Sequence, residues 1–250
     1  MEDIKSKKKI LIFIPAYNVE KKILSVINRI PKEIFTNNYI RILIIDDFSE
    51  DNTKGIVGDY IKRTNSEDLI YLIINKNNKG YGGVQKIAFK YAIENNFDYV
   101  IMLHGDGQYA PEKIPEYIFN LANTEVDAVF GSRFINQKDA LKGGMPLYKF
   151  IGNKALTFIQ NIVIGSKMSE FHSGYRSFKV NSLKNVNFQI NTNNFHFDTE
   201  IIIQMLRLKY VIKEIPMPTF YGTEVSHLKS IPYGLNVLLS TIKYKFFYKD

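Results

Sequence analysis

The segment HGDGQ, residues 104–108, places a histidine, an acid and an amide directly after an apolar run. Asp106 and Gln108 are two residues apart, so their side chains share a face on an extended segment. A carboxylate and an amide oxygen suit a hard divalent cation such as Mg²⁺ or Mn²⁺, and phosphate oxygens would complete its coordination. Such a cation would stabilise a departing diphosphate. The alternative interpretation is an ordinary turn after a strand.

Polar or glycine-rich residues follow four other apolar runs. These segments are PAYN (15–18), DDFS (46–49), NKNNKGYGG (75–83) and GSR (131–133). Turn chemistry explains their glycines and asparagines, but not the acids or Arg133, which could hold a phosphate through a bidentate contact. Of Asp46 and Asp47, one is expected to cap a helix and the other to accept hydrogen bonds from a base or ribose. The glycines would allow the backbone to approach a phosphate closely.

The apolar runs predict the elements that position these residues. Continuous runs rich in Ile, Leu and Val indicate strands buried on both faces, at 9–15, 41–47, 70–75, 99–103 and 127–132. Helical patterns separate them at 19–30, 52–63, 81–95 and 112–122. This alternation predicts an α/β fold with a mostly parallel, twisted sheet and helices on both faces. Ligands of such sheets bind beyond the carboxyl ends of the strands.

The second half of the chain is less regular. It predicts a helix at 145–165, a turn and short strand at 171–179, a helix at 195–210 and an extended segment at 211–222. Leucines and lysines alternate at helical spacing over 232–248, which predicts an amphipathic helix that lies on an anionic membrane surface or packs on its own domain. Without an internal repeat or a linker, residues 1–250 are interpreted as a single domain.

Composition narrows the function classes. The formal net charge of +8 favours an anionic partner. Nucleic acid is excluded as the expected partner, because the acids at the strand ends would repel a phosphate backbone and no RNA- or DNA-binding motif is present. With no cysteine, a metal must be held by oxygen or imidazole. The glycine-rich loop matches neither GxGxxG nor GxxxxGK[ST], which argues against an NAD dehydrogenase and a P-loop NTPase. No apolar run is long enough to span a membrane, so we expect a cytoplasmic protein, either free or peripheral at the cytoplasmic membrane face.

The order of the segments resembles a known family. IFIPAYNVE, ILIIDDFSEDNT, NNKGYGG, HGDGQYAPEKIP, VFGSRF, FHSGYRSF, FDTEIIIQ and EIPMPTFYG span residues from about 10 to 225. In this order they resemble the inverting GT-A glycosyltransferases of family 2, particularly the dolichyl- or polyprenyl-phosphate mannosyl- and glucosyltransferase branch. The resemblance implies a GT-A fold and transfer of a hexose from a donor of the GDP-mannose or UDP-glucose type to a polyprenyl phosphate, with inversion.

The resemblance also implies roles for individual residues. The nucleotide-sugar pocket would contain Pro15, Ala16, Tyr17, Asn18, Glu20, Asp46, Asp47, Gly80, Gly83, Gly105 and Asp106. The ligands of the metal, Mg²⁺ or Mn²⁺, would be His104, Asp106 and Gln108. The acceptor would meet Arg133, His172, Ser173, Gly174, Tyr175 and Arg176. The residues expected to act in catalysis are Asp106, Arg133 and Asp198.

One departure from the family pattern leaves alternatives open. His104 stands where the family's DxD motif has its first acid, and imidazole is a poorer ligand than carboxylate for Mg²⁺. A non-catalytic homologue that binds nucleotide-sugars is therefore one alternative. Another is transfer to a saccharide hydroxyl, which requires a general base. The candidates for such a base are Glu170, His172, Asp198 and Glu200.

Overall fold

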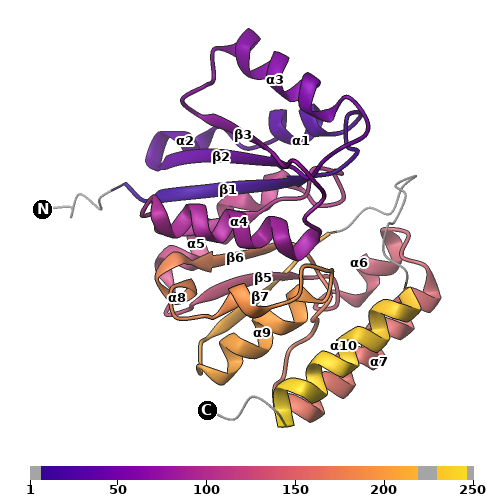
Figure 1. Cartoon of the computed structure of the whole chain (residues 1–250). Coiled ribbons are helices and arrows are strands. Elements are labelled where there is room, and N and C mark those ends of the chain that lie inside the picture. The colour runs from indigo at the N-terminus through magenta and orange to yellow at the C-terminus, as the bar shows by residue number, and fades with distance from the viewer. Residues whose placement is uncertain (1–6, 219–229, 247–250) are drawn as a thin grey trace, which may run out of the picture.

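The computed structural model describes residues 7–218 and 230–246, and its core is one mixed sheet (Figure 1). The strands are β1 Lys9–Ala16, β2 Tyr39–Asp46, β3 Ile70–Ile74, β4 Tyr99–Met102, β5 Ala128–Ser132, β6 Arg176–Lys179 and β7 Ile212–Pro216. Their order in the sheet is β3-β2-β1-β4-β6-β5-β7. Only β6 runs antiparallel to its neighbours, β4 and β5. The predicted α/β class and mostly parallel sheet are confirmed.

Helices cover both faces of the sheet, as the sequence predicts. Alternate residues of β1 enter two separate cores: Ile10, Ile12 and Ile14 one, and Leu11 and Phe13 the other. The first core is covered by α1 Ile23–Asn28, α3 Thr53–Thr64 and α5 Ile114–Asn123. The second is covered by α4 Tyr81–Glu94, α8 Val180–Leu183 and α9 Phe197–Arg207. Strands buried on both faces explain the continuous apolar runs.

Some predicted boundaries are wrong. The helix expected at 19–30 begins only at Ile23, and in the segment before it the backbone N–H groups of Val19 and Glu20 donate to the side chains of Thr53 and Asp51 at 2.9 and 3.0 Å. Likewise α9 begins two residues later than predicted, which leaves Phe195 outside the helix. The helix expected at 112–122 is present as η1 Pro111–Lys113 followed by α5. The sequence analysis missed four short helices: α2 Glu33–Asn37, α6 Gln137–Lys142, α8 and η2 Phe188–Ile190.

Two long helices, α7 Leu147–Ile164 and α10 Ser230–Phe246, lie side by side at one end of the molecule (Figure 1). The predicted C-terminal helix is therefore present. Its Val237, Ser240 and Thr241 are buried, so part of α10 packs on the chain itself, against α7 and α9. In the described ranges, no helix combines the length and the apolar character that a bilayer crossing requires.

Candidate active site

A pocket of about 720 Å³ lies where β1, β2 and β4 end and α4 begins. This is the place where parallel sheets bind ligands. Ten predicted residues line it: Pro15, Ala16, Tyr17, Asn18, Glu20, Asp47, Gly80, His104, Gly105 and Asp106. The structure thus brings together most of the predicted nucleotide-sugar residues.

Asp47 organises the loop that follows β3. Its Oδ1 accepts hydrogen bonds from the Asn75 side chain and the backbone N–H of Lys79, at 2.7 and 2.8 Å. Its Oδ2 accepts the backbone N–H of Gly80 at 2.9 Å. The neighbouring Asp46 is fully buried, and its Oδ2 accepts a backbone N–H from the segment before α3. Both acids therefore hold the loops around the pocket in place through hydrogen bonds. Contact of either acid with a base or ribose stays a prediction.

The glycines of this loop have a packing role that the sequence does not reveal. Gly80 has a φ of +79°, and a Cβ there would lie 2.5 Å from the carbonyl oxygen of Asn193. Gly82 donates to that same oxygen at 2.8 Å. Gly83 is buried in the first turn of α4, where a Cβ would lie 2.9 Å from the Cβ of Lys79. The loop is therefore glycine-rich because segment 192–197 packs closely against it.

Asp106 leaves one carboxylate oxygen open to the pocket, and its role as a metal ligand stays a prediction. It lies on the pocket wall, half-buried, and its Oδ1 accepts the backbone N–H of Gln108 at 2.9 Å. Within the described ranges its Oδ2 accepts no hydrogen bond, so this oxygen can meet a ligand in the pocket. The Gln108 side chain is not among the groups that line the pocket. Three or more acids and histidines do not gather anywhere in the described residues, so a cation at Asp106 would need oxygens of the donor diphosphate.

His104 faces the protein as well as the pocket. Its Nε2 lies 3.4 Å from the hydroxyl of Tyr81, and its ring packs edge-on against Tyr109 with centroids 4.9 Å apart. A Cβ at Gly174 would lie only 2.6 Å from this Nε2. Burial lowers the pKa of His104, although Asp106 opposes the shift, so the imidazole is neutral at pH 7. His104 thereby joins the donor pocket to the predicted acceptor segment.

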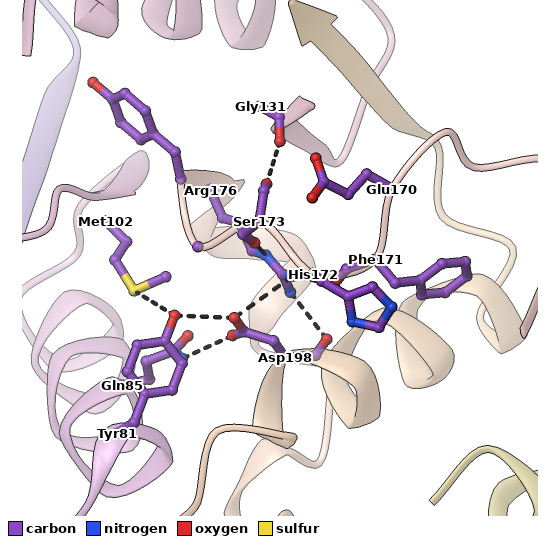
Figure 2. Close-up of polar contacts among 12 residues, drawn as sticks. Tyr81, Gln85, Met102, Gly131, Glu170, Phe171, His172, Ser173, Arg176 and Asp198 are labelled. Carbon is purple, nitrogen blue, oxygen red and sulfur yellow. Dashed lines mark hydrogen bonds and ion pairs between the residues drawn. The ribbon is translucent and has the colours of Figure 1, made fainter. Parts of the chain in front are cut away.

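Asp198 lies behind Tyr81 and accepts several donors at once (Figure 2). The Tyr81 hydroxyl and Gln85 Nε2 each donate to it at 2.9 Å, and Arg176 Nη2 lies 3.6 Å from its Oδ2. Burial, together with Asp198, raises the pKa of Tyr81 well above its ordinary value, so the hydroxyl keeps its proton and donates. A proton taken up by Asp198 would weaken its ion pair with Arg176. This geometry makes Asp198 a residue that positions Tyr81.

Arg176 holds the predicted acceptor segment in its folded shape (Figure 2). Its guanidinium donates to the backbone carbonyls of Phe171, Ser173 and Asp198 at 2.7, 2.8 and 2.9 Å, and its side chain is 1% exposed. The neighbouring Tyr175 is also fully buried. Arg176 and Tyr175 therefore belong to the frame of the segment, and acceptor contact by them stays a prediction.

Arg133 forms a buried ion pair with Glu170. Its Nε donates to Glu170 Oε1 at 2.7 Å, its backbone N–H donates to Glu170 Oε2 at 2.7 Å, and its Nη2 also contacts this carboxylate. The same Nη2 donates to the carbonyl of His172 at 3.1 Å. Arg133 thus fastens the predicted acceptor segment to the end of β5. It does not line the pocket, and contact with a diphosphate stays a prediction.

His172 meets the C-terminal helix. Its Nδ1 lies 2.9 Å from the hydroxyl of Tyr233 in α10, and its Nε2 is buried without a hydrogen-bond partner among the described residues. Burial, with help from Arg133 and Arg176, lowers the pKa of His172 to about 3. An imidazole with this pKa stays neutral at pH 7 and is a weak proton acceptor.

The sequence analysis missed several residues of the pocket. Asn78, Tyr81, Asn194 and Phe195 all line it, with the rings of Tyr81 and Phe195 stacked at 5.2 Å. Tyr81 lies inside the glycine-rich loop already singled out, whereas Phe195 was assigned to the helix expected at 195–210 and Asn194 to no element. Two exposed lysines that also line the pocket, Lys21 and Lys22, lie in the segment that the sequence analysis assigned to a helix at 19–30. Residues 219–222 of the last motif lie outside the described ranges.

Comparison with known proteins identifies the family of this chain. The sequence profile of the family described as Glycosyl transferase family 2 matches residues 11–186, more than half of the chain. The chain belongs to this family. It is a glycosyltransferase with the GT-A fold, as the resemblance predicts.

Relatives of this glycosyltransferase align over almost its whole length. It is 33% identical to the UDP-N-acetylglucosamine–dolichyl-phosphate N-acetylglucosaminyltransferase of Methanococcus voltae, over 97% of this chain and 94% of that relative. It is 24% identical to the undecaprenyl-phosphate mannosyltransferase of Micrococcus luteus, over 88% of this chain and 87% of that relative. Among solved structures, glucosyl-3-phosphoglycerate synthase of Mycobacterium tuberculosis, in complex with Mn²⁺, UDP and phosphoglyceric acid, is similar in fold. Its TM-score is 0.70 at 12% identity, over 99% of this chain and 82% of that one.

Proposed function

We propose that this glycosyltransferase transfers a sugar from a nucleoside diphosphate donor to a polyprenyl phosphate, with inversion at the anomeric carbon. Two relatives that align over most of the chain are named for transfer to dolichyl or undecaprenyl phosphate. The donor would lie in the pocket at the ends of β1, β2 and β4, where Lys21 and Lys22 bring positive charge. A polyprenyl phosphate resides in a membrane, so we further propose that the enzyme works at the cytoplasmic membrane face.

The state of the candidate bases supports a phosphate acceptor over a saccharide hydroxyl. Glu170 is paired with Arg133, and Asp198 is paired with Arg176. Glu200 accepts the backbone N–H of Thr192 at 2.6 Å and a hydroxyl of α10. His172 has its pKa lowered to about 3. A hydroxyl acceptor would need a base, a role for which these four candidates are poorly suited, whereas a phosphate carries its own negative charge and attacks without one. This observation carries the proposal.

The residues of the pocket would then act mainly by positioning. Asp106 would hold a divalent cation together with the donor's diphosphate, and the cation would neutralise charge on that leaving group when bound. Tyr81, fixed by Asp198 and close to His104, would orient the sugar or the diphosphate. Holding the acceptor phosphate in line with the anomeric carbon is the remaining requirement, because in-line attack inverts the configuration.

A substrate panel tests this proposal. The full-length protein is incubated with UDP-N-acetylglucosamine, UDP-glucose or GDP-mannose, with Mn²⁺ or Mg²⁺, and with a polyprenyl phosphate, the matching polyprenol or a free saccharide. We expect one donor to yield a lipid-linked sugar phosphate of inverted configuration, and the polyprenol to yield none. Transfer to the saccharide would overturn the choice of acceptor. Donor binding without any transfer would identify a non-catalytic homologue.

A further inference from the structure

The exposed side of α7 is an apolar stripe. Leu147, Ile151, Phe158 and Ile162 are each between 58 and 65% exposed. Their spacing of four, seven and four residues places them on one side of a helix with 3.6 residues per turn. The opposite side of α7 carries buried groups such as Thr157 and Gln160. Packing within the chain therefore accounts for only one side of α7.

The neighbouring helix α10 repeats this pattern. Ile231, Leu235, Leu239 and Ile242 are between 46 and 79% exposed and follow one another at intervals of four, four and three residues. Nearly half of the large apolar side chains that the described residues expose lie on these two helices. Single exposed apolar residues are common on soluble proteins, but a contiguous group of this kind marks an interaction surface. We call the exposed stripes of α7 and α10 the helix-pair surface.

The charges on the two helices select the kind of partner. The sequences of α7 and α10 contain no acidic residue. Lys154 and Lys243 are exposed on them, and Lys142 and Lys167 are exposed just before and just after α7. Apolar residues beside lysines suit an anionic lipid surface, where the former enter the acyl boundary and the latter meet headgroup phosphates. A second copy of the chain would instead bring lysines against lysines.

The helix-pair surface is also connected to the predicted acceptor segment. Tyr233 of α10 is hydrogen bonded to His172, and Ser240 of α10 donates to Glu200 of α9 at 3.1 Å. These contacts fix α10 beside the segment that Arg176 holds. An enzyme that uses a membrane-resident phosphate must place its acceptor site at the headgroup level.

From these observations we propose that the helix-pair surface of α7 and α10 binds an anionic lipid membrane and thereby holds the region around segment 171–176 near the headgroups. The proposal rests on the lipid-phosphate acceptor proposed above. The two helices form one surface, to which each stripe contributes four large exposed apolar side chains.

Vesicle sedimentation tests the surface directly. The full chain is mixed with phosphatidylcholine vesicles, with or without an equal share of phosphatidylglycerol. The test variant is the double substitution Phe158→Glu and Leu239→Glu, at side chains 65 and 64% exposed. Phe119→Glu, at a side chain 63% exposed on α5, is the matched control. We expect the wild type and the control to bind the anionic vesicles, and the double variant to bind about tenfold more weakly.

Several results would overturn the proposal. One is a wild type that binds neither kind of vesicle, and another is a control that loses as much binding as the double variant. A third is a wild type that is dimeric by light scattering without lipid while the double variant is monomeric, which would assign the surface to a second copy.

An activity measurement separates this proposal from the proposed function. With a short, water-soluble isoprenyl phosphate in place of the vesicle-borne polyprenyl phosphate, the double variant should match the wild type. With the vesicle-borne acceptor, its rate should fall by about the same tenfold as its binding. If the wild type transfers sugar to neither phosphate yet binds the vesicles, the proposed function fails and the membrane surface stands.

Discussion

Polar residues that directly follow β1, β2 and β4, such as Asn18, Asp47 and Asp106, line the pocket, whereas those of segments 131–133 and 170–176 are engaged mainly with one another. Asp106 represents the first region, because one of its oxygens faces the pocket without a protein donor among the described residues. Arg133 represents the second, because Glu170 and a backbone carbonyl take up its guanidinium. Similar residue types at similar strand ends thus serve two purposes. One region is available to a ligand, and the other holds a segment in shape.

The largest expected effect is on the ligand side of this comparison. Asp106→Asn keeps the hydrogen bond to Gln108 within reach but removes the charge that a cation needs. We expect kcat to fall by about a thousandfold with Mn²⁺ or Mg²⁺, while the thermal unfolding temperature stays within a few degrees. Asp68→Asn, at an exposed acid that does not line the pocket, is the control and should keep full activity. Unchanged kcat in D106N would remove Asp106 from the catalytic machinery.

The next effect tests the structural side. Arg133→Met leaves the Glu170 carboxylate buried without its partner, so we expect the free energy of unfolding to fall by about 3 kcal/mol. The double variant Arg133→Met, Glu170→Met should recover most of this loss, because no lone charge is left in the interior. Urea unfolding of the two variants measures the difference. If R133M instead folds normally and raises only the KM for the donor, Arg133 acts on the diphosphate and the comparison fails.

A smaller effect is expected where the glycine-rich loop before α4 meets segment 192–197. Gly80→Ala places a Cβ against the carbonyl oxygen of Asn193 at a φ of +79°, so we expect a loss of about 2 kcal/mol in the free energy of unfolding. Gly58→Ala, in α3, meets no atom within 4 Å and should stabilise the protein slightly. Thermal and urea unfolding compare the two. Equal stability of G80A and G58A would mean that the contact between the loop and segment 192–197 is not tight.

The smallest effect is a pH dependence. His172 has a folded-state pKa of about 3 against an ordinary value of 6.5, and the groups around it are Arg133, Arg176 and the Tyr233 hydroxyl. Below pH 6.5 the unfolded chain binds a proton that the folded chain does not, so stability falls as the pH decreases from 6.5 toward 3. This contribution is about 1 kcal/mol per pH unit and is absent above pH 6.5. His172→Asn should lose less stability than the wild type between pH 6.5 and 5; an identical loss would contradict the buried neutral imidazole.

Much of the fold could be predicted because its signal is local. Buried parallel strands produce continuous apolar runs, and the five strands expected in the first half are all present. Local signals misplaced the starts of α1 and α9, because the first N–H groups of a helix have no partner within it and the conformation there depends on distant residues, as Val19 does on Thr53. The antiparallel β6 between β4 and β5 could not be predicted from the chain, because strand order depends on long-range pairing.

By itself, the sequence determined the fold class, the family and the strand ends that form the pocket. The spacing of apolar residues and the polar residue types at strand ends can both be recognised from residues close together in the chain. The tertiary structure alone decided how the remaining polar residues are used. Asp198 meets Tyr81 across more than a hundred residues, and Arg133 meets Glu170 across 37. Whether an acid is free to bind a ligand depends on the partner that folding brings to it, and no local pattern encodes that partner.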